Sequence, residues 1–432
     1  MAESSRSLIE PARARIGETV LLRGWIYRLR TLRETTFVVL RDCSGEIQCV
    51  GATAALHGLR PKQDDTVEIQ GMVLAEARAK GGSEVAIVRL SVLNPASHRL
   101  PFNSAGSIDT VSLDTQLEYR PLSLRTSRTR DIFTVRNALL GYFREYLGAH
   151  RFTEIITPKL VANGTEGGAN LFGLDYFGRT AYLAQSPQLY KEHGVAAFER
   201  VFETGQVYRA EPHASSRHLT EYYSLDLEMG FIDGPEDVIE LERDLLAFMF
   251  EQLAAEHGDV LRRCHAPPLP EIRNAPVWEF AECLARLRQD ERATPTAHDL
   301  DPEAERLLCS LAREEAGAAC VFVLGYPLSA RPFYTSPRGT DGAAQSFDLL
   351  LNGVEVTTGG QRHHERAALE AAMKERGMKV GAFADHLRAF DLGMPPHGGL
   401  AIGLERLTAQ LLGLGNVREA VMYPRDRYRL TP

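Results

Sequence analysis

The 432-residue chain lacks the patterns of secreted, zinc-binding and membrane-spanning proteins. Its six cysteines form no C-x-x-C pair, which argues against a disulfide framework and against a zinc site of paired cysteines. No run approaches the roughly 20 apolar residues needed to cross a bilayer, and residues 1–16 carry no apolar core of a secretory signal. We therefore expect a cytoplasmic protein without membrane contact.

The chain also lacks the usual phosphate-binding loops. It contains neither G-x-G-x-x-G nor G-x-x-x-x-G-K-[ST] and shows no alternation of strands and helices, which argues against Rossmann and P-loop nucleotide sites. A net charge of -8 argues against non-specific coating of nucleic acid, because that binding depends on Lys and Arg displacing phosphate counterions. A local basic face stays compatible with this charge.

Short strand signals recur at regular spacing near the N-terminus, over residues 19–26, 36–40, 46–50, 66–73 and 85–93. Five such strands favour a small barrel, and both an OB-fold and an SH3-like barrel fit them. Longer amphipathic helices, over 132–147, 235–257 and 302–316, then mix with antiparallel strand signals, which indicates an α+β domain. The predicted divisions are a barrel domain over 1–100, a linker over 101–130 and an α+β domain over 131–432 with a helical insertion at about 233–319.

The segment Gln185-Ser-Pro-Gln-Leu-Tyr-Lys191 predicts a helix that begins near Pro187. Gln188 and Lys191, three residues apart, would then share one helix face and could contact one small ligand. The alternative is a solvated lysine on an ordinary surface helix.

A strand, a polar loop and a second strand are predicted over residues 208–229. Arg209 and Glu211 would share a face of the first strand, and Asp226 and Glu228 a face of the second. A half-exposed sheet with a charged outer face would show the same pattern. The loop between the strands adds the anion-binding side chains of Arg217 and His218.

Asn352-Gly353 between two apolar runs predicts a tight hairpin. Such a turn pairs Leu350 with Glu355 and Asp348 with Thr357, so Asp348 and Glu355 become diagonal neighbours about 7–8 Å apart. Two carboxylates and a nearby threonine hydroxyl suit Mg²⁺ completed by water and phosphate oxygens. A surface pair of acids would look the same.

Two glycine-containing segments follow this hairpin. Gly359-Gly-Gln-Arg362 allows close approach of a ligand to the backbone and then presents a guanidinium suited to a carboxylate. Gly403-Leu-Glu-Arg406 begins a helix, where a flat base could lie against Gly403 while Arg406 meets phosphate. Taken singly, these residues are also compatible with packing or a surface position.

Three motifs in one order resemble the class II aminoacyl-tRNA synthetases: residues 151–158, Tyr208-Arg-Ala-Glu211 and Gly403-Leu-Glu-Arg406. From Val20 to the C-terminus the chain is similar to aspartyl-tRNA synthetases of the short archaeal and eukaryotic-like type. The resemblance implies an OB-fold anticodon domain, a class II catalytic domain with an antiparallel sheet, and a homodimer formed through the first motif. It also implies L-aspartate, ATP and tRNA(Asp) as substrates and Mg²⁺ as cofactor.

The resemblance implies a role for each matching residue. The aspartate site would consist of Glu166, Gln188, Leu189, Tyr190, Lys191, Arg209, Asp226, Thr358 and Arg362. The ATP site would consist of Arg209, Ala210, Glu211, Arg217, His218, Leu219, Glu355, Gly403, Leu404, Glu405 and Arg406. The catalytic residues would be Arg209, Arg406 and Glu355, the Mg²⁺ ligands Asp348, Glu355 and Thr358, and the anticodon readers Tyr27, Phe37, Gln48, Lys80 and Glu84.

These residue types fit the expected chemistry. A carboxylate already ionised at pH 7 attacks the α-phosphate of ATP, so catalysis needs positioning and charge neutralisation rather than a general base. Lys191 and Arg362 would read the side-chain carboxylate of aspartate. Asparagine would leave both cations without a countercharge, so no editing domain is expected.

Three rival functions use similar residues. An asparaginyl-tRNA synthetase is disfavoured by Ser186-Pro187 and Lys191, an amide-forming ligase by the intact barrel, and a non-catalytic RNA-binding paralogue by intact Arg209 and Arg406.

The choice of tRNA is left open by the sequence. Lys80 resembles the form that charges tRNA(Asp) alone, whereas Tyr27 matches neither that form nor the one that also charges tRNA(Asn). Charging of tRNA(Asn) would imply a tRNA-dependent amidotransferase as partner. Departures at Pro212, Ala214 and Thr220 leave the contacts with the tRNA acceptor end open.

Overall fold

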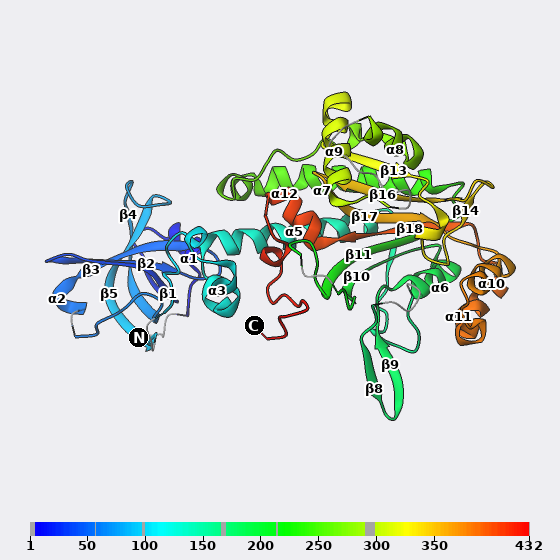
Figure 1. Ribbon diagram of the computed structural model, residues 1–432. Helices are drawn as coiled ribbons and strands as arrows, with labels where there is room; N and C mark the ends of the chain where they lie inside the picture. The colour runs from blue at the N-terminus through cyan, green and yellow to red at the C-terminus, as the bar shows by residue number, and fades with distance from the viewer. Residues whose placement is uncertain are drawn as a thin grey trace. The chain divides into compact units, whose positions relative to one another are not determined.

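The chain forms two compact units, Met1–Ser127 and Arg128–Pro432. The computed structural model (Figure 1) describes residues 5–56, 58–96, 100–165, 170–212, 215–289 and 299–431. No helix within these ranges is both long and apolar enough to cross a membrane.

The first unit is a closed barrel with strand order β1-β2-β3-β5-β4. Its strands are β1 (Thr19–Thr31), β2 (Thr35–Arg41), β3 (Glu46–Ala52), β4 (Thr66–Ala75) and β5 (Ser83–Asn94). Alternate residues point inward, as period-2 strands require, and Val20, Leu22, Val38 and Leu40 are among those that form one apolar core. The prediction of a five-stranded, OB-like barrel is confirmed.

Short helices complete the first unit. Helix α1 (Ile9–Arg13) adds Ile9 and Ala12 to the barrel core, and α2 (Thr53–Leu56) follows β3. The segment predicted as a linker contains η1 (Ile108–Thr110), α3 (Leu113–Glu118) and α4 (Arg120–Ser123).

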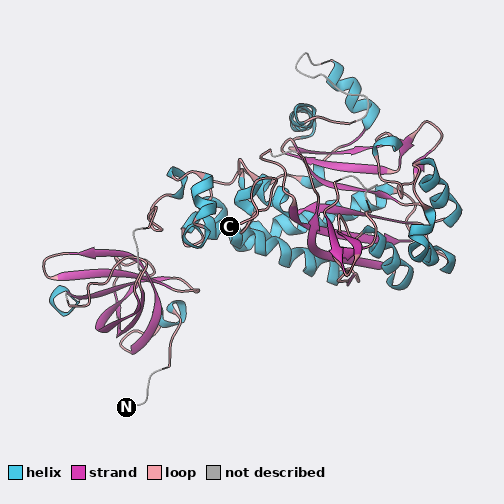
Figure 2. Ribbon diagram, turned by 60° about the horizontal axis from the view of Figure 1, so that its bottom comes forward, coloured by secondary structure: helices cyan, strands magenta, loops and turns pink. Residues whose placement is uncertain are grey.

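The second unit is built on an eight-stranded sheet with order β12-β13-β16-β17-β18-β11-β10-β6 (magenta in Figure 2). The edge strands β6 and β12 pair in parallel and the six between them pair in antiparallel fashion. The strands are β6 (Thr153–Glu154), β10 (Arg200–Tyr208), β11 (Glu221–Gly230), β12 (Val277–Glu279), β13 (Cys320–Leu324), β16 (Ser346–Leu351), β17 (Val354–Gln361) and β18 (His397–Gly403).

One face of this sheet carries the main hydrophobic core. Leu225 and Leu227 of β11 and Leu400 and Ile402 of β18 pack there with α5 (Ser127–Ala149), α7 (Pro235–Arg263) and α12 (Leu404–Leu412). The residues that alternate with them, such as Asp226, face the other side of the sheet. That side is also where α6 (Gln188–Phe198) places Gln188 and Lys191.

The segment predicted as a helical insertion contains α7, η2 (Ile272–Asn274), β12, α8 (Phe280–Arg288) and α9 (Pro302–Ala316). Helix α9 has the predicted bounds, because Asp301 caps its first turn and Gly317 ends it with φ 69°. Helix α7 continues past the predicted end at residue 257, where His257 only kinks it. The edge strand β12 was not predicted.

Smaller elements surround this sheet. Strands β7 (Leu160–Val161), β8 (Gly173–Tyr176) and β9 (Arg179–Leu183) form a separate sheet, and β8 and β9 project from the domain in Figure 1. Strands β14 (Pro337–Arg338) and β15 (Ala343–Ala344) pair with each other. The remaining helices are η3 (Leu328–Ala330), α10 (Arg366–Glu375), η4 (Val380–Phe383), α11 (Ala384–Leu387), η5 (Arg388–Leu392) and η6 (Val417–Ala420).

Candidate active site

A pocket of about 310 Å³ opens on the face of the sheet opposite the main core. Fourteen of the predicted site residues line it: Gln188, Lys191, Arg209, Glu211, Arg217, His218, Leu219, Asp226, Glu355, Thr358, Arg362, Gly403, Glu405 and Arg406. Residues up to 218 positions apart along the chain thus meet in one cavity.

Five other predicted site residues do not line this pocket: Leu189, Tyr190, Ala210, Asp348 and Leu404. Leu404 lies in the main core, Leu189 packs against a second apolar cluster, and the Tyr190 ring lies beside His193. Glu166 and Ala214 fall outside the described residues.

Lys191 lies deep in the pocket floor. Helix α6 starts at Gln188 after Pro187, as predicted, and Lys191 is only 1% exposed. Its Nζ lies 3.1 Å from Asp226 Oδ1 and 3.2 Å from Glu228 Oε2. The alternative of a solvated lysine on a surface helix is therefore wrong. The alternative of a half-exposed sheet with a charged outer face is also wrong, because the Asp226 and Glu228 carboxylates are buried.

Arg362, immediately after β17, is the second buried cation. Its Nε donates to Glu228 Oε1 at 2.9 Å and its Nη2 to the carbonyl of Gly399 at 3.1 Å. Glycine is required at position 399, because a Cβ would lie 2.1 Å from the Leu227 carbonyl oxygen. Burial raises the pKa of Glu228, but Arg362 and Lys191 more than reverse this and keep it below its ordinary value.

These ion pairs change the reason for which the pocket would reject asparagine. We expected Lys191 and Arg362 to lack a countercharge unless the ligand supplied one. The protein itself provides Asp226 and Glu228 for them. An uncompensated charge is therefore not the penalty that asparagine would incur.

The hairpin carrying the predicted metal ligands contains a bulge. Asn352 (φ 51°) and Gly353 (φ 81°) form the predicted turn and Leu350 pairs with Glu355, but Asp348 pairs with Thr358 rather than Thr357. The register shifts because β17 has one extra residue between Glu355 and Thr357.

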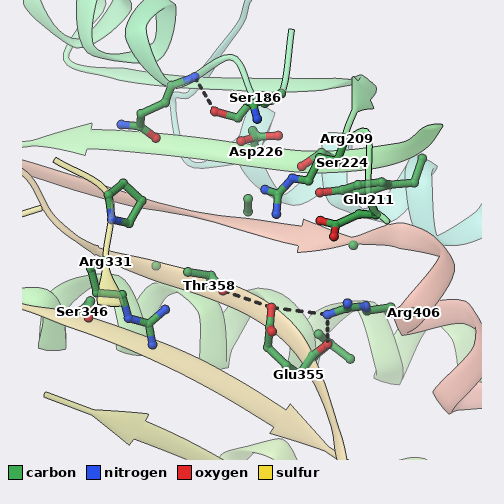
Figure 3. Close-up of a pocket in the computed structure, with 18 of the residues that line it drawn as sticks. Ser186, Arg209, Glu211, Ser224, Asp226, Arg331, Ser346, Glu355, Thr358 and Arg406 are labelled. Atoms are coloured by element: carbon green, nitrogen blue, oxygen red, sulfur yellow. Dashed lines mark hydrogen bonds and ion pairs between the residues drawn. The ribbon is translucent and has the colours of Figure 1, made fainter. Parts of the chain in front are cut away.

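This bulge has a consequence for the site. On a regular strand Glu355 and Thr358, three residues apart, would face opposite sides. Here the Thr358 hydroxyl donates to Glu355 Oε1 at 3.1 Å, so both point into the pocket (Figure 3).

Arg331 is a pocket residue that the sequence analysis missed. Its guanidinium donates to both carboxylate oxygens of Asp348, at 3.0 and 2.8 Å, and lies 3.8 Å from the centroid of the Tyr326 ring. Burial raises the pKa of Asp348, Arg331 lowers it, and nearby Glu355 raises it again, so the net shift is upward. No spacing in the sequence connects Arg331, which directly follows η3, with Asp348, so no sequence signal could have identified it.

Arg406, in the first turn of α12, lies directly beside Glu355 in the pocket wall. Its Nη1 donates to the Glu355 carbonyl at 2.9 Å and lies 3.4 Å from the carboxylate. Burial raises the pKa of Glu355, but Arg406 and Arg331 outweigh burial and bring the pKa below its ordinary value. The carboxylate is therefore ionised at neutral pH. Figure 3 shows Arg209 and Glu211 on the opposite wall.

Arg209 and Glu211 follow the end of β10 instead of sharing a strand face, so that prediction is wrong. The Arg209 N–H still donates to the Thr220 carbonyl at 2.9 Å, but the Ala210 N–H donates to Asn170 at 2.7 Å, which ends the pairing of β10 with β11. Both side chains nevertheless line the pocket.

Two further predicted ATP residues form ion pairs with other side chains of the protein. Arg217 forms an ion pair with Glu305 of α9 and donates to the Gly353 carbonyl. Glu405 lies 2.9 Å from Arg136 Nη2 and accepts from the Tyr223 N–H at 3.1 Å. Burial raises the pKa of Glu405, while Arg136 opposes that shift.

A second hollow lies on the barrel and includes Phe37 and Gln48 together with Arg28 and Arg30. Gln48 donates to Glu84 at 2.8 Å, so three of the predicted anticodon readers lie together.

Glu84 itself, Tyr27 and Lys80 do not line this hollow. Tyr27 is buried under the guanidinium of Arg41, 3.4 Å from its ring centroid, with its hydroxyl 3.1 Å from Ser127 Oγ. Lys80 lies in the exposed turn between β4 and β5.

No group of three or more His, Cys, Asp or Glu side chains arranged to hold a metal ion occurs within the described part of the chain. The two carboxylates Asp348 and Glu355 would therefore need oxygen atoms from phosphate or water to complete a Mg²⁺ site.

Comparison with known proteins agrees with the geometry. Residues 112–427 match the model of the class II tRNA synthetases (D, K and N). The aspartate–tRNA(Asp/Asn) ligase of Thermus thermophilus is 46% identical over 99% of this chain and 100% of its own length. The aspartate–tRNA(Asp) ligase of Pyrobaculum aerophilum is 40% identical over 96% of each.

Solved structures of two specificities share the fold. The asparaginyl-tRNA synthetase of Pyrococcus horikoshii superimposes with a TM-score of 0.91 at 28% identity over 100% of both chains. The aspartyl-tRNA synthetase of Entamoeba histolytica gives 0.86 at 28% identity over 100% of this chain and 93% of its own. The fold is therefore shared by enzymes specific for aspartate and for asparagine. The relatives at 40–46% identity, in contrast, are named for aspartate. The chain belongs to the class II tRNA synthetases, as a member of the aspartate–tRNA ligase family.

Proposed function

We propose that this protein attaches L-aspartate to tRNA(Asp) in an ATP-dependent reaction that passes through an aspartyl-adenylate. The observation that carries the proposal is the pair of buried cations, Lys191 and Arg362, in the floor of a pocket whose walls carry Arg209 and Arg406. Two fixed cations suit a side-chain carboxylate, and the arginines of the walls suit phosphates.

The pocket residues support adenylate formation by positioning. Arg209 would hold the α-phosphate beside the attacking carboxylate, and Arg406 the γ-phosphate. Glu211 would read the adenine amino group, with Arg217, His218 and Leu219 along the triphosphate. Because the attacking carboxylate is already ionised, these residues need to orient it and to neutralise charge rather than remove a proton.

ATP binding would require a change of partner at Arg217. This guanidinium is paired with Glu305, and a triphosphate would compete with that carboxylate for it. The higher charge of the phosphates favours the exchange.

Glu355, with Asp348 and the Thr358 hydroxyl, would hold Mg²⁺. All three offer the hard oxygen atoms that this ion prefers, and the bulge places Glu355 and Thr358 on one face. Asp348 shares its oxygens with Arg331, so its contribution would be weaker than that of Glu355. When bound, the ion would neutralise charge on the phosphates.

Discrimination against asparagine then follows from donor geometry. Lys191 and Arg362 present only N–H donors. An asparagine amide has one oxygen that accepts and one NH₂ group that donates, so its NH₂ group would face one of the two cations donor to donor, whereas the aspartate carboxylate accepts from both. This mismatch of donors, rather than an unpaired charge on Lys191 or Arg362, would exclude asparagine, and no separate editing site is needed.

We extend the proposal to tRNA(Asn) as a second acceptor. The relatives of Thermus thermophilus and Deinococcus radiodurans, 46% and 44% identical, are both named for tRNA(Asp/Asn). Aspartyl-tRNA(Asn) would then need a tRNA-dependent amidotransferase as a partner. Both tRNAs are cytoplasmic substrates, and we propose that location for the enzyme.

We also propose a homodimer. β6 is an edge strand of the large sheet, and Ile156, just after it, is 94% exposed. An open strand edge beside an exposed isoleucine supports association with a second copy.

Aminoacylation of separate tRNA(Asp) and tRNA(Asn) transcripts with labelled aspartate and asparagine tests the proposed function. We expect aspartate on both tRNAs and asparagine on neither. Asparagine on tRNA(Asn) would show an asparaginyl-tRNA synthetase, and charging of neither tRNA would overturn the proposal.

A further inference from the structure

From Gln188 in the pocket, a row of buried polar side chains continues to residues that have no role in the proposed reaction. Gln188 Nε2 donates to Glu192 Oε1 at 3.0 Å, one turn further along α6. The other oxygen of Glu192 lies 3.0 Å from His386 Nε2 of α11, and His386 Nδ1 lies 3.2 Å from His193 Nε2. Glu192 is 0% and His386 4% exposed, and neither lines the pocket.

The charge of Glu192 is maintained by its neighbours. Burial alone raises the pKa of this carboxyl, but His386, His397 and the amide of Gln188 outweigh burial and bring the pKa to about 2. The carboxylate is therefore ionised at neutral pH and can only accept hydrogen bonds.

An acceptor at this place fixes the orientation of the Gln188 amide. The NH₂ group must face Glu192, so the carbonyl oxygen faces the other way, where it accepts from Arg362 Nη2 at 3.4 Å. The reversed amide would place donor against donor at Arg362 and acceptor against acceptor at Glu192. Gln188 is also the member of this row that lines the pocket.

We propose that Glu192 and His386 are positioning residues that hold Gln188 with its carbonyl oxygen ready to accept a hydrogen bond from the ammonium group of the amino acid substrate. This inference rests on the proposed function and assigns the ammonium group of the substrate to Gln188 and Asp226, two of the predicted aspartate-site residues that line the pocket. An ammonium group has only donors, so it needs the oxygen of Gln188 and not the nitrogen. His386 acts one step further away, by keeping Glu192 an acceptor.

Steady-state ATP–pyrophosphate exchange by the full-length protein tests the assignment. Glu192→Gln removes the negative charge that lies beside His386 and leaves one oxygen at residue 192, where Glu192 turns one oxygen toward Gln188 and the other toward His386. We expect KM for aspartate to rise about ten- to a hundredfold, the range of a hydrogen bond to a charged group, while KM for ATP changes less than about twofold. An unchanged KM for aspartate, or an equal rise in both KM values, would overturn the inference.

A double-mutant cycle asks whether Glu192 acts through Gln188. In a Gln188→Ala background the amide to be oriented is gone, so Glu192→Gln should raise KM for aspartate by less than about threefold. If the two substitutions have independent, multiplying effects, Glu192 does not act through Gln188 and the proposal fails.

Two substitutions at His386, one conservative and one not, test the role of this residue separately. His386→Gln keeps a polar N–H group beside the Glu192 carboxylate and should stay close to wild type, whereas His386→Leu removes that group and should raise KM for aspartate as Glu192→Gln does. Equal effects of both substitutions would contradict the role of His386. This pair also tests the proposal if Glu192→Gln does not fold.

Glu203→Gln is the matched control, because Glu203 is an equally buried carboxylate, paired with Lys159 at 2.8 Å, that does not line the pocket. It should leave the ratio of the two KM values unchanged. If wild type itself shows no aspartate-dependent exchange, the proposed function fails; if wild type is active and Glu192→Gln matches it, the inference alone fails.

Discussion

Two lysines show how differently the two units of this protein carry charge. Lys191 in the catalytic pocket is 1% exposed and lies within 3.2 Å of two carboxylates, whereas the Lys80 side chain on the barrel is 85% exposed and lies 3.6 Å from one. The charges of the pocket are thus fixed by neighbouring side chains, whereas Lys80 on the barrel is free to reorient and, under the proposed function, would be ordered only when RNA binds. Substitutions in the pocket should therefore have much larger effects than substitutions on the barrel.

The largest effect is expected for Lys191→Met. In the proposed function it removes a cation that would bind the substrate carboxylate, and it leaves Asp226 without its partner and Glu228 with Arg362 alone. Removing one partner of a buried ion pair is strongly unfavourable, and we expect aspartate-dependent exchange to fall about a thousandfold or more. Lys159→Met, which breaks the pair with Glu203 outside the pocket, is the control; similar losses in both variants would show general destabilisation.

Arg331→Leu should have the next largest effect. Without this guanidinium Asp348 is left buried beside Glu355, and the repulsion between the two acids raises the pKa of Asp348 further. We expect kcat of exchange to fall about a hundredfold, as for other charge-positioning groups, with a higher Mg²⁺ requirement. Arg338→Leu removes an exposed arginine paired with Glu279 and should change neither quantity; a wild-type Mg²⁺ requirement in Arg331→Leu would contradict this role.

Phe37→Ala probes the barrel side of the comparison. Loss of one stacking partner costs about 1–3 kcal/mol per base, so KM for tRNA(Asp) should rise about tenfold or somewhat more. Exchange needs no tRNA and should stay at the wild-type rate. A fall in the exchange rate would contradict the proposal that the barrel acts only in tRNA binding and the pocket in adenylate formation.

The smallest effect concerns stability and pH. Burial raises the pKa of Glu242 in α7 to about 8, and Thr357 lowers it only in part. Because the folded state then binds a proton that the unfolded state has lost, this group stabilises the fold below its ordinary pKa of 4.5 and that contribution is lost as pH rises toward 8. Glu242→Gln should remove this slope, at most about 1.4 kcal/mol per pH unit, in urea unfolding at pH 6 and pH 8; parallel slopes in both proteins would contradict it.

Local patterns in the sequence predicted much of the fold. The turn at Asn352, the start of α6 after Pro187 and both ends of α9 depend on short-range rules and agree with the structure. The barrel followed from five strands of regular spacing.

Features that depend on distant residues could not be predicted in this way. The bulge in β17, the bond of Arg331 to Asp348 and the countercharges of Lys191 arise only when strands and loops far apart in sequence come together. A bulge shifts register without any distinctive residue at the site. A buried ion pair leaves no periodic signal when its members lie on different elements.

In the proposed mechanism, the preorganised pair of cations Lys191 and Arg362 selects a carboxylate side chain. ATP–pyrophosphate exchange by the wild-type protein, measured with L-aspartate and with L-asparagine in parallel, tests this selection. We expect rapid exchange with aspartate and at least about a thousandfold lower kcat/KM with asparagine, the penalty for a donor facing a donor in a buried site. Comparable exchange with both amino acids, or exchange with asparagine alone, would contradict it.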